Sequence, residues 1–71
     1  MPLIQMTMIE GRDAATKRRL IAELTEVAVT VLDAPRSSVR VILNEVTTAD
    51  WGVEGEPLSD RLARRAEGDA R

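Results

Sequence analysis

The sequence predicts an α+β fold built on a single βαβ unit, and three observations lead to this prediction. Residues 2–9 are short and apolar, and residues 38–46 are rich in β-branched side chains, as strands are. Between them, apolar residues recur every three or four positions up to Leu32, which is the period of an amphipathic helix. This order favours two parallel strands joined by a right-handed crossover.

The first strand is expected over residues 2–9, with Gly11 closing it. Pro2 is tolerated there because it is the first residue of the strand and its missing N–H costs no internal ladder bond. Because strand side chains alternate, one face carries Pro2, Ile4, Met6 and Met8. The opposite face carries Leu3, Gln5, Thr7 and Ile9.

The helix is expected to begin after Asp13, a good N-cap residue, and to run to about Leu32. The sequence Asp33-Ala34-Pro35 ends it, because proline lacks a donor and disfavours a helical residue before it. Its apolar stripe consists of Leu20, Ile21, Leu24, Val27, Ala28, Val31 and Leu32. The charged side chains lie largely off this stripe, on a solvated face.

The second strand is expected over residues 38–46, with Val39, Val41 and Leu43 on one face and Arg40, Ile42 and Asn44 on the other. Residues 47–57 predict a loop with a small hairpin around Gly52 and Gly55. Residues 58–71 are charged and predict a short helix in their first half, followed by a frayed end. We interpret residues 1–71 as one domain, with residues 59–71 as a charged tail.

A unit of this size is expected to need a partner chain. A domain of 71 residues buries little surface, and this chain has no Cys with which to form a disulfide. One helix covers one face of a two-stranded sheet, which leaves both edges and the face with Leu3, Ile9 and Ile42 open. The sequence therefore predicts an oligomer that continues the sheet and covers its bare face.

Composition excludes several functional classes. The chain has neither Cys nor His, so we expect no metal site, and its few glycines predict no phosphate-binding loop and no cofactor. A net charge of −2 and a single aromatic residue, Trp51, argue against nucleic acid as a partner. No segment is long enough to span a membrane or patterned as a secretory signal, so a cytoplasmic location is expected.

The candidate for catalysis is the amino terminus. Initiator Met is normally removed before a small residue such as proline, so Met1 is expected to be trimmed and Pro2 to carry a free secondary amine. An ordinary α-amino group has a pKa of about 7.7–8.0, and an apolar pocket or nearby cations lower it further. Such an amine suits a general base at neutral pH. A Met-Pro start has no such meaning by itself, so this interpretation depends on its context.

That context resembles the 4-oxalocrotonate tautomerase family. The resemblance lies in PLIQMTMIEGR at the start, a helix ending in LDAP, the segment SSVRVILNEV, and an aromatic-glycine pair at Trp51-Gly52. It covers roughly residues 2–58 without an evident gap. The family fold it implies is a tautomerase-like βαβ subunit whose dimers form four-stranded sheets with helices on one face. The implied assembly is a hexamer, a trimer of such dimers.

The resemblance also implies the roles of four residues. Pro2 matches the amino-terminal proline that shuttles a proton in an unsaturated 2-oxo or 2-hydroxy acid. Arg12 matches an arginine that binds the distal carboxylate of the substrate. Arg40 matches an arginine that reaches the site of a neighbouring subunit, where it binds the C1 carboxylate and polarises the 2-oxygen. Trp51 matches an aromatic residue that walls the pocket and keeps the proline pKa low.

The implied reaction is the isomerisation of a 2-hydroxydienoate to a conjugated 2-oxo-enoate, such as 2-hydroxymuconate to 2-oxo-3-hexenedioate, in aromatic catabolism. The base moves one proton, and the arginines stabilise charge that develops on oxygen. Arginine forks suit carboxylates because two parallel hydrogen bonds fix the orientation. Taken singly, Arg12 is explained by an exposed turn, Arg40 by an intersubunit salt bridge and Trp51 by an interface contact.

Two alternatives accompany this interpretation. The first is a hydratase or dehalogenase of short unsaturated acids with Glu54 activating water, because related chloroacrylic acid dehalogenases carry a carboxylate one position from this point. Those enzymes also use a pair of arginines near the end of the first strand, where this chain has Ile9, and that disfavours the alternative. The second is a non-catalytic subunit of a hetero-oligomer. Pro57 and the tail beyond Leu58 also depart from the shortest family members.

Overall fold

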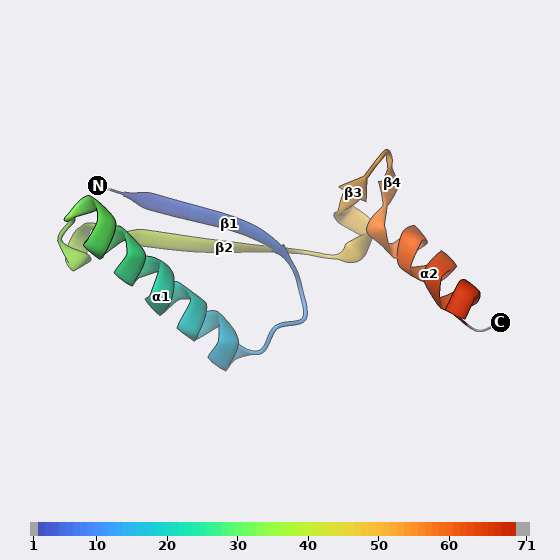
Figure 1. Ribbon diagram of the computed structural model, residues 1–71, viewed down its shortest axis with the longest axis horizontal. Helices are drawn as coiled ribbons and strands as arrows, with labels where there is room; N and C mark the ends of the chain where they lie inside the picture. The colour runs from blue at the N-terminus through green and yellow to red at the C-terminus, as the bar shows by residue number, and fades with distance from the viewer. Residues whose placement is uncertain (1, 70–71) are drawn as a thin grey trace.

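The computed structural model describes residues 2–69, which contain two main strands, two helices, a small hairpin and two short 3₁₀ turns (Figure 1). In chain order the elements are β1 (Leu3–Ile9), α1 (Ala14–Leu32), η1 (Arg36–Ser38), β2 (Arg40–Val46), η2 (Thr48–Asp50), β3 (Gly52–Val53), β4 (Glu56–Pro57) and α2 (Leu58–Asp69).

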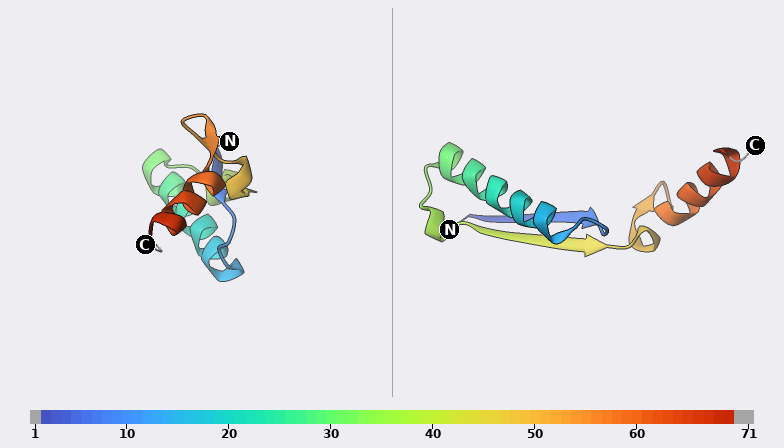
Figure 2. Two further views of the ribbon diagram at one scale, coloured as in Figure 1. Left: turned by 90° about the vertical axis from the view of Figure 1, so that its right-hand side faces the viewer. Right: turned by 90° about the horizontal axis from the view of Figure 1, so that it is seen from below.

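The first two strands form the predicted parallel pair. Their register runs from Leu3 opposite Arg40 to Ile9 opposite Val46, so both strands start at one end of the pair and finish at the other. Helix α1 crosses back over one face of this pair, and the other face carries no helix (Figures 1 and 2). The expected βαβ unit with parallel strands is therefore confirmed.

Side chains alternate along the strands as the pattern predicts. Ile4, Met6, Val41 and Leu43 are half-buried beneath α1, and the residues between them are exposed. The alternation ends at Ile9, which is half-buried instead of exposed where β1 gives way to the following loop. Within residues 2–66, whose side-chain exposure is described, only Ala28 (5% exposed) and Val39 (8%) are buried. The core of a single chain is thus incomplete.

Both ends of α1 follow local signals. Asp13 is the N-cap, and its Oδ1 accepts a hydrogen bond from the Thr16 amide at 2.8 Å. At the other end Asp33 adopts a left-handed conformation (φ 53°) and caps the helix before Pro35. A salt bridge of 2.8 Å between Lys17 and Glu45 fastens the start of α1 to the end of β2.

The second strand begins two residues later than the sequence predicts. Residues Arg36–Ser38 form a 3₁₀ turn, in which the Ser38 amide and hydroxyl both donate to the Pro35 carbonyl at 2.9 and 2.8 Å. These bonds keep Ser38 out of the ladder, so β2 starts at Arg40.

Residues 48–69, from η2 to α2, form what we call the C-terminal arm, which extends away from the βαβ unit (Figure 1). The radius of gyration is 16.8 Å, compared with about 11 Å for a compact domain of this length. The hairpin predicted around Gly52 and Gly55 is present as β3 and β4. Helix α2 continues to Asp69, further than the short helix predicted; the chain end beyond it lies outside the described residues.

The exposed apolar side chains lie where a partner would cover them. On α1 Val31 is 74% exposed and Val27 58%, and on the bare sheet face Leu3 is 55% exposed and Ile42 44%. Contact of these large apolar side chains with water is unfavourable.

Candidate active site

The candidate site residues fall into two groups at opposite ends of the β1–β2 pair. Pro2 and Arg40 lie where the strands start, and their backbones are joined, because the Arg40 amide donates to the Pro2 carbonyl at 3.0 Å. Arg12 and Trp51 follow the other ends of the strands. The seven residues of β1 separate the two ends by about 23 Å at about 3.3 Å per residue.

The side chains of Pro2 and Arg40 point to opposite faces of the sheet. Pro2 is half-buried and shares the parity of Ile4, whose face α1 covers, whereas Arg40 is exposed and pairs with exposed Leu3. The Arg40 Nη1 donates to the carbonyls of Ser37 at 2.7 Å and Val39 at 3.2 Å. The guanidinium is therefore held by its own η1 turn on the bare face, away from the Pro2 ring of the same chain.

Arg12 lies in the short connection that carries the chain from β1 into α1. The Glu10 amide donates to the Val46 carbonyl at 2.9 Å and so extends the ladder one residue past β1. Gly11 then takes φ 123°, a conformation that side-chain-bearing residues rarely adopt, and the chain turns. The Asp13 cap follows, so Arg12 is held between a ladder bond and a helix start, with its side chain exposed.

An open hollow of about 430 Å³ lies beside Arg12. Met6, Met8 and Leu20 give it apolar walls, and Arg12, Thr16, Arg19 and Glu23 supply its polar lining. Arg19 pairs with Glu23 at 3.3 Å one helical turn along. An apolar hollow edged by an arginine suits an unsaturated chain that ends in a carboxylate.

Trp51 lies at the base of the C-terminal arm and is half-buried. Its carbonyl accepts a hydrogen bond from the Leu58 amide at 2.7 Å, and its amide donates to Thr48 at 3.4 Å. These bonds join η2, the hairpin and the first turn of α2 at one point. The Trp51 backbone is thus fixed where these three elements of the arm meet.

Glu54 lies at the tip of the hairpin, exposed and with φ 52°. Gly55 follows with φ 85°, so both central residues of this two-residue turn have positive φ, as a type I′ turn requires. Glycine tolerates this conformation, whereas a residue with a β-carbon is strained in it. Glu54 is therefore an unfavourable residue for its own backbone.

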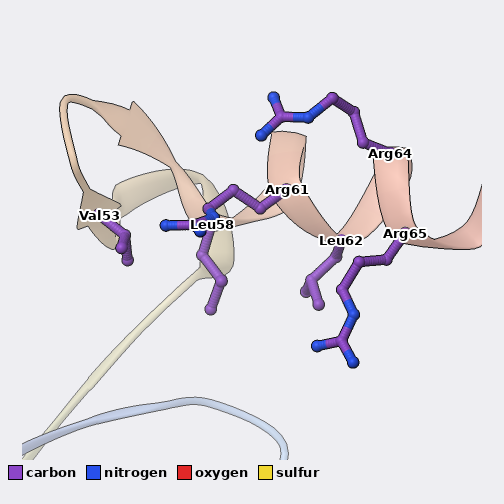
Figure 3. Close-up of a pocket in the computed structure, with 6 residues that line it drawn as sticks. All are labelled: Val53, Leu58, Arg61, Leu62, Arg64 and Arg65. Carbon is purple, nitrogen blue, oxygen red and sulfur yellow. The ribbon is translucent and has the colours of Figure 1, made fainter.

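Sequence reasoning missed the contribution of the charged tail. A hollow of about 480 Å³ lies along the arm, lined by Val53, Leu58, Leu62, Arg61, Arg64 and Arg65 (Figure 3). Arg64 Nη1 bonds Glu56 Oε2 at 2.7 Å, Arg64 Nη2 bonds Glu56 Oε1, and Arg61 Nε lies 3.7 Å from that same oxygen. The sequence offered only one hint of these ion pairs. An acidic residue, Glu56, precedes Pro57, and arginines follow it.

These contacts shift the pKa values of two side chains in the arm. The hydrogen bonds from Arg64 lower the pKa of Glu56, and the same pair raises the pKa of Arg64. Among residues 2–69, no cluster of acidic side chains is arranged to hold a metal ion. Over the same residues, neither helix is long and apolar enough to cross a bilayer.

Comparison with known proteins defines the class. The family model described as tautomerase enzyme matches residues 2–61, so the chain belongs to the tautomerase family. It is therefore an isomerase of the 4-oxalocrotonate tautomerase type, and the resemblance seen in its sequence is confirmed.

Two curated relatives illustrate the similarity. A probable tautomerase of Ralstonia nicotianae is 59% identical over 59 residues, which are 83% of this chain and 84% of the relative. A 2-hydroxymuconate tautomerase of Pseudomonas putida is 43% identical over 64 residues, 90% of this chain and all of the relative.

Solved structures agree with the fold. A 4-oxalocrotonate tautomerase isozyme of Methylibium petroleiphilum superposes with a TM-score of 0.85 at 36% identity, covering 89% of this chain and 98% of the other. A heterohexameric 4-oxalocrotonate tautomerase from Chloroflexus aurantiacus gives 0.80 at 35% identity, with 84% and 97% covered.

Proposed function

We propose that this chain catalyses the conversion of a 2-hydroxydienoate to its conjugated 2-oxo-enoate, with 2-hydroxymuconate as the model substrate. The observation that carries the proposal is the separation of two complementary groups on a family fold. A prospective base, Pro2, lies at one end of β1, and a prospective carboxylate ligand, Arg12, lies beside an apolar hollow past the other end.

The proposed chemistry needs only one proton-carrying group. Once Met1 is removed, the Pro2 amine takes the proton of the 2-hydroxyl and returns a proton to C5, while the double bonds shift toward the new 2-oxo group. No atoms are gained or lost. Arg40 binds the C1 carboxylate and the 2-oxygen, where negative charge develops, and Arg12 binds the distal carboxylate. Trp51 excludes water and favours the uncharged amine.

In this proposal the site is assembled from several chains. The strand length of about 23 Å prevents Arg12 from reaching Pro2 of its own chain, and Arg40 points to the opposite face from that Pro2. We infer a homo-oligomer, a hexamer as in the Chloroflexus relative but with identical chains, and the uncovered apolar surface supports it.

The test begins with the mass of the purified protein, which should lack Met1. Pro2→Ala should then reduce kcat/KM for 2-hydroxymuconate by about 10²–10⁴-fold, the range for loss of a general base. Arg18→Gln, an exposed change on α1, is the control and should leave activity unchanged. An active protein that retains Met1, or a fully active Pro2→Ala variant, would contradict the proposal.

A second function, water addition to a short unsaturated acid, has one observation in its favour. Glu54 occupies a strained backbone conformation at the hairpin tip, and strain of this kind concentrates at functional sites. Glu54→Gln separates the two functions, because the tautomerase reaction should survive it, whereas hydration or dehalogenation should be lost. A non-catalytic subunit would show neither activity, even with Met1 removed.

A further inference from the structure

The arm contains an ion pair that fastens its helix to its hairpin. Glu56 lies in β4, opposite Val53 of β3, and Arg64 lies two turns into α2. Both guanidinium nitrogens of the Arg64 fork bond to the two carboxylate oxygens of Glu56, and Arg61 lies 3.7 Å from one of them. Two parallel bonds fix an angle as well as a distance.

Neither the hairpin nor helix α2 is stable by itself. The hairpin has two residues in each strand, too few for stability alone, and a helix of twelve residues is marginal in water. Leu62 is 45% exposed, whereas Val53 and Leu58 are half-buried, so apolar contact within the arm is only partial. The Glu56–Arg64 pair is therefore a specific side-chain contact between α2 and the hairpin, beside the backbone bond from Leu58 to Trp51.

The Arg64 side chain lies at the margin of the hollow along the arm. Val53, Leu58 and Leu62 point to one side of the arm, as Arg65 does, whereas Arg64 leaves α2 in the opposite direction (Figure 3). Arg65 provides a matched control, with the same charge on the same helix turn but on the other side.

The arm carries Trp51 at its base. The Leu58 amide, at the first turn of α2, bonds the Trp51 carbonyl at 2.7 Å, and Gly52, the next residue, begins β3. The Trp51 backbone is thus joined both to the start of α2 and to the start of the hairpin.

We propose that Arg64 is a positioning residue, whose paired hydrogen bonds to Glu56 orient the arm so that Trp51 forms the wall of the active site. The proposal rests on the function proposed for Trp51 above. Arg64 does not touch substrate. It acts through Glu56 and the hairpin, and α2 thereby gains a role in substrate binding.

The experiment compares Arg64→Gln with Arg65→Gln in the full-length, Met1-free protein. Trp51 is the only aromatic residue, so tryptophan emission and acrylamide quenching report on the arm alone. Arg64→Gln should shift the emission to longer wavelength and raise KM for 2-hydroxymuconate by about two- to fivefold, the range for an exposed ion pair, with little change in kcat. Arg65→Gln should match the wild type in both.

Two further variants keep the test decisive. Arg64→Lys retains the charge without the fork and should give an intermediate shift. The reversed pair, Glu56→Arg with Arg64→Glu, should restore the emission and KM, even if Arg64→Gln alone fails to assemble by native mass. A wild-type spectrum in Arg64→Gln, equal effects of Arg64→Gln and Arg65→Gln, or failure of the reversed pair would overturn the proposal. The emission readout remains valid even if Pro2→Ala shows that the proposed chemistry is wrong.

Discussion

The Arg40 amide donates a hydrogen bond of 3.0 Å to the Pro2 carbonyl, although the side chains of these two residues lie on opposite faces of the sheet. Backbone pairing thus makes neighbours of a prospective base and a prospective substrate ligand that cannot serve the same pocket within one chain. In the proposed assembly, Arg40 would serve a chain that covers the bare face.

Shared sites predict that two inactive variants restore each other. Pro2→Ala keeps Arg12, and Arg12→Ala keeps Pro2, so a mixed oligomer contains some sites with both residues. Random mixing in a symmetric assembly should make about one quarter of the sites complete. Activity should return after co-expression or joint refolding. Mixtures that stay inactive would show that both residues serve the site of one chain.

Glycine at position 54 should stabilise the arm. Glu54 has φ 52°, and relief of this conformation is worth about 1 kcal/mol for a residue with a β-carbon. Glu54→Gly should therefore raise the midpoint of thermal unfolding by several degrees. Glu54→Gln retains the β-carbon and should leave the midpoint unchanged. Equal midpoints for the two variants would show that the turn carries no strain.

Acid should loosen the arm through Glu56. Its pKa is lowered below the ordinary value of 4.5 by the hydrogen bonds from Arg64, so the folded state binds the Glu56 proton less readily than the unfolded state does. The stabilisation is present above pH 4.5 and is lost as the pH falls through the lowered pKa. Trp51 emission should shift in that window.

The same titration has an internal control. In Glu56→Gln, the emission shift in that window should disappear, because no carboxylate remains to be protonated. Asp13, whose pKa is lowered by its bonds to Thr16, should then account for a separate loss of helix content, measured by circular dichroism. An emission shift that persists in Glu56→Gln would point to another acidic group.

A charge on the exposed face of α1 should block assembly without unfolding the chain. Val31 is 74% exposed in the single chain, so Val31→Glu costs little there but places a charge in the expected interface. Native mass should fall to smaller species, and activity should fall with it. Thr30→Glu, at an exposed polar position beside it, should assemble normally. Normal assembly of Val31→Glu would show that this face stays in water.

Much of the βαβ unit could be predicted because its signals are local. Asp13 caps α1 and Pro35 follows its end, and the alternation of β1 follows from residue parity alone. The start of β2 could not be predicted, because the Ser38 amide and hydroxyl both donate to the Pro35 carbonyl and form a turn where the β-branched pattern favoured a strand.

The structure of the arm was less predictable, because it depends on contacts between Glu56, before Pro57, and the arginines of α2, after it. The sequence showed charges in α2, but only the fold brings Arg64 to Glu56. The candidate site residues came from a resemblance, and their chemistry in this chain stays a prediction. Since the pocket is proposed to form between chains, no local pattern in one chain could have defined its shape.

The opposite placement of Pro2 and Arg12 along β1 also bears on gene duplication. Each chain would donate a base at one end and a carboxylate ligand at the other, so a duplicated gene would be free to specialise. A copy that lost Pro2 would still contribute Arg12 and Trp51 to the pockets of its neighbours. Its own pocket would lack a base and would be inactive. A single substitution on this fold could therefore produce two unlike chains, one that supplies the base and one that supplies only the carboxylate ligand.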